Sequence, residues 1–263
     1  MEIFLATVLF ILGAVFGSFA CCQAYRIHKG REKLLKQAPS HCLKCHKRLE
    51  PVELIPILSW IVQKGRCKKC HEPIGSAEIL AEIGLGLAFL LSYLFFPFPL
   101  TTTLEVVRFA VFLLVLVPLA VIFIYDLKWG LLPTKLIALS VICATVFWVL
   151  SSESLFSTAK ILSLLGSIGI LSGIYYLLYF FSKEKLVGAG DWLLALPLAI
   201  MLGDVWLAFF ALFAANLIGC LVTVPLLACK KLKNPRIPFG PFLISGFLIV
   251  FLIQNWLLSL IIF

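Results

Sequence analysis

Charged residues are scarce in this sequence. Only 13% of its 263 residues are Asp, Glu, Lys or Arg, whereas 62% are hydrophobic. A soluble domain needs roughly 25% charged residues to keep its surface hydrated. The shortage excludes an ordinary soluble domain and predicts that much of the outer surface faces lipid.

Acidic residues are fewer still, 13 against 22 Lys and Arg, which gives a formal net charge of +9. An excess of positive charge can indicate nucleic-acid binding. Here, however, Lys and Arg lie between long apolar runs, where such residues orient membrane helices. We therefore expect membrane lipid, and no nucleic acid, as a partner.

The apolar runs predict an all-α polytopic membrane protein with about eight transmembrane helices, because about 20 apolar residues span a bilayer. The expected spans are residues 3–24, 78–97, 105–125, 133–151, 159–181, 190–203, 205–228 and 239–261. The first is expected to be retained, since Met1–Cys22 carries Glu2 but no Lys or Arg at its polar start, and its apolar run is too long for the h-region of a signal peptide. The sixth is short and requires a tight turn at Gly203-Asp204.

The distribution of Lys and Arg predicts the orientation. Of the 22, 20 lie on the side that holds the connections 25–77, 126–132, 182–189 and 229–238, and only Arg108 and Lys160 lie near the other. Such an asymmetry is typical of the cytoplasmic side. The sequence therefore predicts a multi-pass protein of the bacterial cytoplasmic (inner) membrane. It divides into a first transmembrane helix at 1–25, a cytoplasmic Cys-rich domain at 26–77 and a seven-helix membrane domain at 78–263.

The cytoplasmic insertion between helices 1 and 2 carries two Cys-x-x-Cys pairs, Cys42/Cys45 and Cys67/Cys70, separated by 21 residues. Two such knuckles can close a tetrahedral zinc site, and a structural metal would stabilise a segment too short for a sufficient core. The alternatives are four free thiols, redox chemistry and a disulfide, which a reducing cytoplasm disfavours. We expect Cys42, Cys45, Cys67 and Cys70 to bind one structural Zn²⁺.

Two aspartates lie at the ends of predicted membrane helices, where acidic residues are rare and usually have a structural or functional role. Asp126 ends the third span and Asp191 opens the sixth, in the motif Gly188-Ala189-Gly190-Asp191. If they meet, one carboxyl keeps its proton and the other stays charged, which allows aspartic proteolysis. Gly188 and Gly190 would support the active site by letting the backbone turn and a peptide approach.

Structural explanations exist for each acid taken alone. Asp126 could be a solvated edge residue paired with Lys128, and Asp191 could stabilise a helix N-terminus through the dipole. The same dipole role would explain Glu78 and Glu82 at the start of the second span. The sequence by itself does not show that the two aspartate side chains meet.

An ordered set of motifs resembles the bacterial type IV prepilin peptidases, which are leader peptidases and N-methyltransferases of the Gly-x-Gly-Asp membrane aspartic peptidase type. The resemblance covers nearly the whole chain. The matching motifs, besides the cysteine pairs, are Gly17-Ser18-Phe19, Tyr25-Arg26, Ile55-Pro56-Ile57-Leu58-Ser59-Trp60, Gly65-Arg66-Cys67, Glu82 with Gly86, Asp126 with Leu132-Pro133, Gly188 to Asp191, and Ile237-Pro238-Phe239-Gly240-Pro241.

The resemblance implies that Asp126 and Asp191 are the catalytic pair of an aspartic endopeptidase. It would remove the basic leader of type IV prepilins, or of competence and secretion pseudopilins, after a glycine at the cytoplasmic membrane face. It also implies N-methylation of the new N-terminus with S-adenosylmethionine, whose site the sequence does not locate.

Three positions depart from the family pattern, Cys21, Glu78-Ile79 and Leu193. They bear on methylation more than on cleavage, so a peptidase without methyltransferase activity is one alternative. A proton-coupled transporter and a non-catalytic zinc-bearing scaffold are others, although a transporter would usually show inverted repeats and acids near the midplane.

Overall fold

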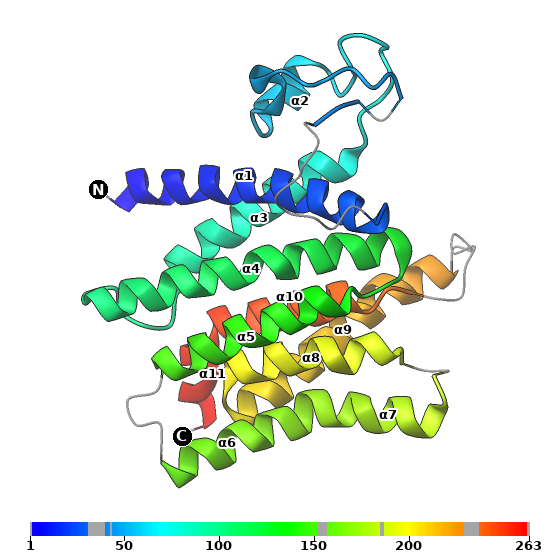
Figure 1. Cartoon of the computed structure of the whole chain (residues 1–263). Coiled ribbons are helices and arrows are strands. Elements are labelled where there is room, and N and C mark those ends of the chain that lie inside the picture. The colour runs from blue at the N-terminus through cyan, green and yellow to red at the C-terminus, as the bar shows by residue number, and fades with distance from the viewer. Residues whose placement is uncertain are drawn as a thin grey trace. The chain divides into compact units, whose positions relative to one another are not determined.

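The structure of the chain is a computed structural model, which describes residues 2–30, 40–42, 44–151, 157–184, 187–228 and 237–261. Within these residues every regular element is helical, and the only β pairings are two isolated bridges. The chain folds into two compact units, Met1–Leu94 and Phe95–Phe263, each described here by itself (Figure 1). The predicted all-α membrane fold, with the cysteines between its first two long helices, is confirmed.

The first unit consists of two long helices, α1 (Glu2–His28) and α3 (Ser76–Leu94), with a small module between them in the sequence. The helices pack closely because Gly13 and Gly17 face α3. A Cβ on Gly17 would lie 2.4 Å from the carbonyl oxygen of Ala81, and one on Gly13 would lie 2.6 Å from that of Leu85. Small residues four apart allow this backbone contact between membrane helices, where close van der Waals packing drives association.

The cysteine module, defined here as residues 40–75, contains only two short helical elements among its described residues. These are the 3-10 helix η1 (Pro51–Leu54) and the five-residue helix α2 (Leu58–Val62). A module this small buries little apolar surface, so it depends on polar contacts or a metal for its stability.

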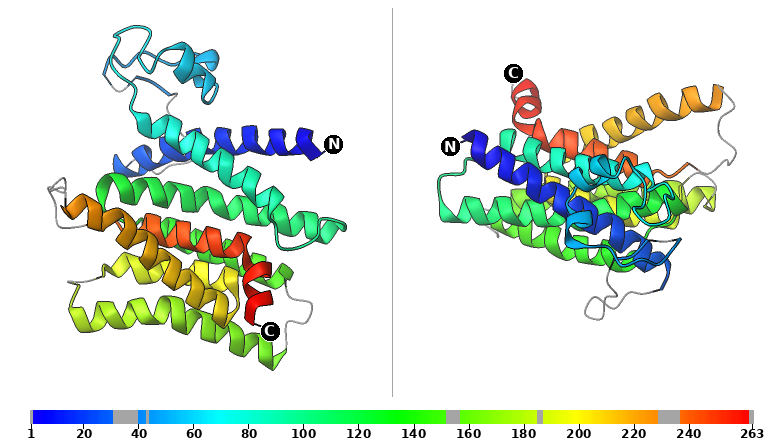
Figure 2. Two further views of the ribbon diagram at one scale, coloured as in Figure 1. Left: turned by 180° about the vertical axis from the view of Figure 1, so that it is seen from behind. Right: turned by 90° about the horizontal axis from the view of Figure 1, so that it is seen from above.

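The second unit is a bundle of membrane helices in which α8 occupies the centre (Figures 1 and 2). Its elements are α4 (Thr103–Trp129), α5 (Thr134–Ser151), α6 (Thr158–Ile168), the π-helix η2 (Gly169–Gly173), α7 (Ile174–Ser182), α8 (Ala189–Leu202), α9 (Val205–Ala228), α10 (Gly240–Leu252) and α11 (Gln254–Ile261). Helix α8 packs against α5, α6, α7 and α10, and eight of its residues between Leu194 and Leu202 are buried.

Six helices of the described chain are long and apolar enough to cross a membrane, and the bent pair α10–α11 would make seven. The remaining predicted span is α8, which has only 14 residues. About eight spans were predicted, and the difference lies in these two elements. The expected turn after α8 is confirmed: Gly203 is left-handed at φ 62°, and Asp204 accepts backbone hydrogen bonds from Trp206 and Leu207 at the start of α9.

Candidate active site

Asp126 lies in the last turn of α4, and its environment is closed. Only 4% of the residue is exposed, so Asp126 is not the solvated edge residue that the sequence allowed. Gly130 ends the helix in a left-handed conformation and donates its N–H to the Asp126 carbonyl oxygen. The side-chain Oδ2 accepts a hydrogen bond of 2.9 Å from the backbone N–H of Gly240, the first residue of α10.

Asp191 lies in the first turn of α8 and is half-buried. Its Oδ2 accepts the backbone N–H of Gly188, the N-cap residue, at 3.0 Å. This hydrogen bond satisfies one of the donors that a helix leaves free at its N-terminus, and the dipole there favours a carboxylate. A helix-capping role for Asp191 is therefore physically sound. It does not explain why the ends of two other helices pack against this residue's surroundings.

Leu132 connects the surroundings of the two aspartates. A Cβ placed on Gly190 would lie 2.6 Å from Leu132 Cδ1, and one placed on Gly240 would lie 3.3 Å from Leu132 Cδ2. The same Cβ on Gly240 would lie 2.8 Å from Asp126 Oδ2 and 3.2 Å from Leu194 on α8. The end of α4 and the starts of α8 and α10 therefore meet in one place, and Gly190 and Gly240 have no room for a side chain.

The two predicted catalytic residues lie in this one site. Leu132 lies against Gly190, the neighbour of Asp191, and close to Gly240, whose N–H binds Asp126. Neither Gly188 nor Gly190 has a positive φ, so what Gly190 provides is space for Leu132 rather than an unusual backbone conformation. The geometry brings together two carboxylates that are 65 positions apart in the sequence.

Polar groups that the sequence analysis did not assign also surround the site. Tyr175, which follows the π-helix η2, is buried, and its hydroxyl accepts a 3.0 Å hydrogen bond from Asn216 on α9. The Tyr175 ring also lies 5.5 Å, centroid to centroid, from that of Phe239, the residue before Gly240. Ser172 within η2 donates to the carbonyl oxygen of Trp192, next to Asp191, at 2.8 Å.

The signals for these groups are weak in the sequence. Tyr175 is one aromatic residue in an apolar run, and a π-helix, which often occurs at functional sites, has no sequence signature of its own. Gly240 belongs to a recognised motif, but only the structure shows that its N–H binds Asp126.

The two cysteine pairs in the first unit are built alike. In the first knuckle the N–H of Cys42 donates to Lys47 O and the N–H of His46 donates to Cys42 O. In the second knuckle the N–H of Cys67 donates to Glu72 O and the N–H of His71 donates to Cys67 O. His46 and His71 both have φ 55°, which closes each turn.

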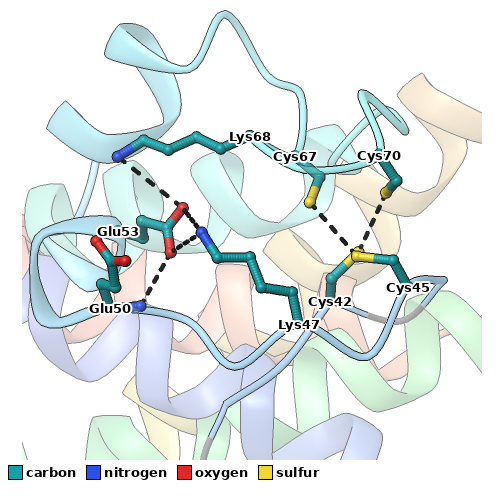
Figure 3. A network of polar contacts seen from close by, with 8 residues as sticks. All are labelled: Cys42, Cys45, Lys47, Glu50, Glu53, Cys67, Lys68 and Cys70. Atoms are coloured by element: carbon teal, nitrogen blue, oxygen red, sulfur yellow. Dashed lines mark hydrogen bonds and ion pairs between the residues drawn. The ribbon is translucent and has the colours of Figure 1, made fainter.

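The four sulfur atoms converge (Figure 3). All lie within 4.8 Å of one another, with Cys42 Sγ 3.7 Å from Cys70 Sγ and Cys45 Sγ 3.9 Å from Cys67 Sγ. A tetrahedron with Zn–S distances near 2.3 Å has sulfur–sulfur edges of about 3.8 Å. The predicted set of Cys42, Cys45, Cys67 and Cys70 therefore has the size of a zinc site.

The electrostatics of the module favour a bound cation. Backbone N–H groups of Cys70 and Lys69 lower the pKa of Cys67 to about 6, and those of Cys45 and Lys44 lower the pKa of Cys42. These hydrogen bonds stabilise thiolates. Crowding has the opposite effect on Cys70, whose pKa is raised to about 11 by burial and by its contacts with Cys45, Cys67 and Cys42. A divalent cation would therefore be needed to hold all four cysteines as thiolates.

A buried carboxylate joins the two knuckles (Figure 3). The side chain of Glu53 is 1% exposed, and Lys47 lies 3.1 Å from its Oε1 while Lys68 lies 3.9 Å from the same atom. The backbone N–H of Glu50 donates to Glu53, and this bond, with Lys47 and Lys68, holds the pKa of Glu53 below its usual value. Since Lys47 follows the first cysteine pair and Lys68 lies within the second, Glu53 connects them independently of a metal.

Comparisons with known proteins identify relatives over most of the chain. Residues 11–96 match the family described as the bacterial peptidase A24 N-terminal domain. A prepilin leader peptidase/N-methyltransferase of Bacillus subtilis is 28% identical over 260 residues, 96% of each chain. Proteins of the same name from Aeromonas salmonicida (30% identical, 84% of this chain and 74% of the relative) and Legionella pneumophila (27%, 90% and 82%) also match. No solved structure matches significantly.

Proposed function

The chain belongs to the prepilin leader peptidase/N-methyltransferase family of membrane enzymes, and we propose that Asp126 and Asp191 are its catalytic pair. In this proposal the enzyme removes the basic leader of a type IV prepilin or pseudopilin. Cleavage is assigned to the predicted membrane domain, 78–263, and both aspartates fall within the compact unit Phe95–Phe263. None of the relatives' names favours the transporter that the sequence left open.

The observation that carries this proposal is the convergence of two carboxylates from separate helix ends in a largely buried site. Two carboxylates that share a site do not both ionise readily, so one holds a proton while the other is charged. The charged one activates water, and the protonated one polarises the scissile carbonyl. The described hydrogen bonds engage Oδ2 of each aspartate, which fixes both side chains for this task.

The cysteine module supplies a structural zinc site in this proposal. The four thiolates would hold Zn²⁺ and bind the two knuckles together, and the ion has no part in peptide cleavage. The sulfur–sulfur distances support this role. S-adenosylmethionine would supply the methyl group for the new N-terminus, in keeping with the names of the relatives.

We place the protein in the bacterial cytoplasmic membrane, with the cysteine module and the aspartates at the cytoplasmic face. The support is the concentration of Lys and Arg on that side of the predicted topology. The basic leader of the substrate would then reach the site from the cytoplasm, while the hydrophobic segment that follows the leader lies in the membrane.

The proposal is tested by incubating the purified enzyme in liposomes with a prepilin and S-adenosylmethionine. The expected product has a new N-terminus after the leader glycine and a mass increased by one methyl group. A cleaved product that never gains the methyl group would reduce the function to a peptidase alone. Cleavage that resists replacement of the aspartates but stops on addition of a zinc chelator would instead indicate a metalloprotease.

A further inference from the structure

The cysteine module carries an exposed apolar surface that its own core does not use. Six large apolar residues of η1, α2 and the turn between them are 44–75% exposed: Val52, Leu54, Ile55, Leu58, Ile61 and Val62. We call them the apolar face. Leu58, Ile61 and Val62 lie at positions i, i+3 and i+4, which is one side of a helix. Soluble proteins rarely leave such a cluster in water, so the apolar face indicates an interaction surface.

The inner side of α2 is occupied differently. Trp60 packs on Gly65, where an added Cβ would lie 2.8 Å from the indole ring. Gly65 also has φ 65°, which favours glycine, and its N–H donates to Trp60 O. Helix α2 is therefore held to the module by Trp60, and by helix geometry Leu58, Ile61 and Val62 lie on the other side of the helix from this contact.

A hydrogen bond to α3 sets the level at which α2 begins. The backbone N–H of Ile57, the N-cap residue of α2, donates to Glu82 Oε2 at 2.7 Å. Glu82 lies six residues after Ser76, the first residue of α3, and is only 7% exposed. At about 1.5 Å per residue, the backbone of Glu82 lies about 9 Å along α3 from its start, and its side chain extends from there to Ile57. Glu82 thus does more than complement the helix dipole.

The cysteine module belongs to the same compact unit as α1 and α3. The Ile57–Glu82 hydrogen bond joins the start of α2 to the N-terminal part of α3. Both α1 and α3 are long and apolar enough to cross the bilayer. The apolar face therefore begins near the N-terminal end of a helix that is long and apolar enough to span the bilayer, within reach of the membrane surface.

The turn that leads into α2 is strained. Ile57 has φ 62° and ψ −54°, and the N–H of Leu58 donates to Pro56 O across it at 2.6 Å. This is the rare form of γ-turn with positive φ, which is costly for a β-branched residue. Strained backbone persists only where surrounding contacts hold it. Here the carboxyl group of Glu82 accepts the N–H of Ile57 and holds the turn.

The charge of the module identifies the occupant. Residues 40–75 contain seven Lys and Arg against three Glu. Lys64 and Arg66 directly follow α2 and are exposed. Apolar side chains next to basic ones are typical of segments that lie in the interface of an anionic membrane. We propose that the apolar face docks onto the lipid bilayer. It would act as an interfacial segment that holds the cysteine module at the membrane surface.

Photo-crosslinking to lipid tests this proposal in the full-length protein. We would introduce Ile61→p-benzoylphenylalanine, reconstitute the protein into vesicles of phosphatidylethanolamine and phosphatidylglycerol, irradiate, and measure the mass of the intact chain. Arg48→p-benzoylphenylalanine is the matched control, because Arg48 is exposed in the same module but lies outside the apolar face. We expect at least several-fold more phospholipid adduct at position 61 than at position 48.

Equal adduct at the two positions would overturn the proposal, as would an adduct at position 61 to a second copy of the chain. Crosslinking to added prepilin in place of lipid would also overturn it and would make the apolar face a substrate surface. Val62→p-benzoylphenylalanine repeats the test at the most exposed position of the face, so that a poorly folding Ile61 variant does not decide the outcome.

Discussion

In the cysteine module the two cysteines of each pair are three residues apart, whereas the groups of the aspartate site come from positions 126, 191 and 240. Each knuckle places its cysteines with backbone hydrogen bonds that span at most five residues. The aspartate site instead depends on two glycines that let three helix ends touch. Local chemistry builds the first site, and long-range packing builds the second, so the two should respond differently to substitution.

The largest expected effect follows from removing either aspartate. Asp126→Asn and Asp191→Asn should each lower the cleavage rate by about 10³-fold or more, because Asn keeps the shape but cannot share the proton or carry the charge. The double variant should be little worse than either single one, since the two act as a unit. Cleavage of a prepilin by purified protein in liposomes measures the rate.

Asp204→Asn is the control for these variants, because Asp204 caps α9 beyond the other end of α8. It should cleave at nearly the normal rate. A folded, membrane-inserted Asp191→Asn protein with near-normal cleavage would end the assignment of the pair.

The long-range character of the aspartate site predicts a strong effect of one methyl group. Gly240→Ala places a Cβ 2.8 Å from Asp126 Oδ2 and should displace that side chain. A misplacement of about 1 Å can cost about 10²-fold in rate. We expect a fall of about 10- to 100-fold in kcat, with unchanged membrane insertion. Gly169→Ala, where a Cβ would meet nothing within 4 Å, should keep its activity; equal losses in both variants would contradict the steric explanation.

Removal of the metal should separate the two regions. Purified protein should contain about one zinc per chain, and Cys67→Ser should lose it and make residues 40–75 more susceptible to proteolysis. Cleavage should fall far less than in Asp126→Asn, because the aspartates lie in the other compact unit. Elemental analysis and limited proteolysis check these outcomes. A metal-free wild-type protein, purified without chelator, would favour free thiols.

The smallest expected effect concerns Glu53. Its pKa is lowered in the fold, so its contribution to stability is present above the pKa of the unfolded chain and is lost as the pH falls through the lower folded pKa. At neutral pH, Glu53→Gln should therefore release zinc to a chelator faster, by about tenfold. In zinc-free protein, where cysteine protonation releases no metal, the stability difference between the variant and the wild type should disappear as the pH falls through the lowered pKa of Glu53.

Glu72→Gln is matched to this variant, because Glu72 pairs with Lys44 on the exposed surface of the same module. Exposed ion pairs contribute little, so zinc release should hardly change. If both variants release zinc equally fast, the buried contact of Glu53 with the two knuckles has no special role.

Composition and spacing determined the membrane class, the order of the long helices and the four cysteines that converge in one cluster. These features are local: an apolar run forms a helix in lipid whatever its neighbours, and Cys-x-x-Cys closes a knuckle with its own backbone. The motif at 188–191 also marked Asp191 correctly as the start of a helix.

The tertiary structure alone decided that Asp126 is buried, that Gly240 donates to it and that Leu132 lies against Gly190. It also decided that Glu82 binds the strained turn at Ile57, and that the 14-residue α8 lies inside the bundle. These contacts join residues that are 25 to 114 positions apart. No pattern within one helix specifies which face of another it will meet, because that choice depends on the packing of all the helices together.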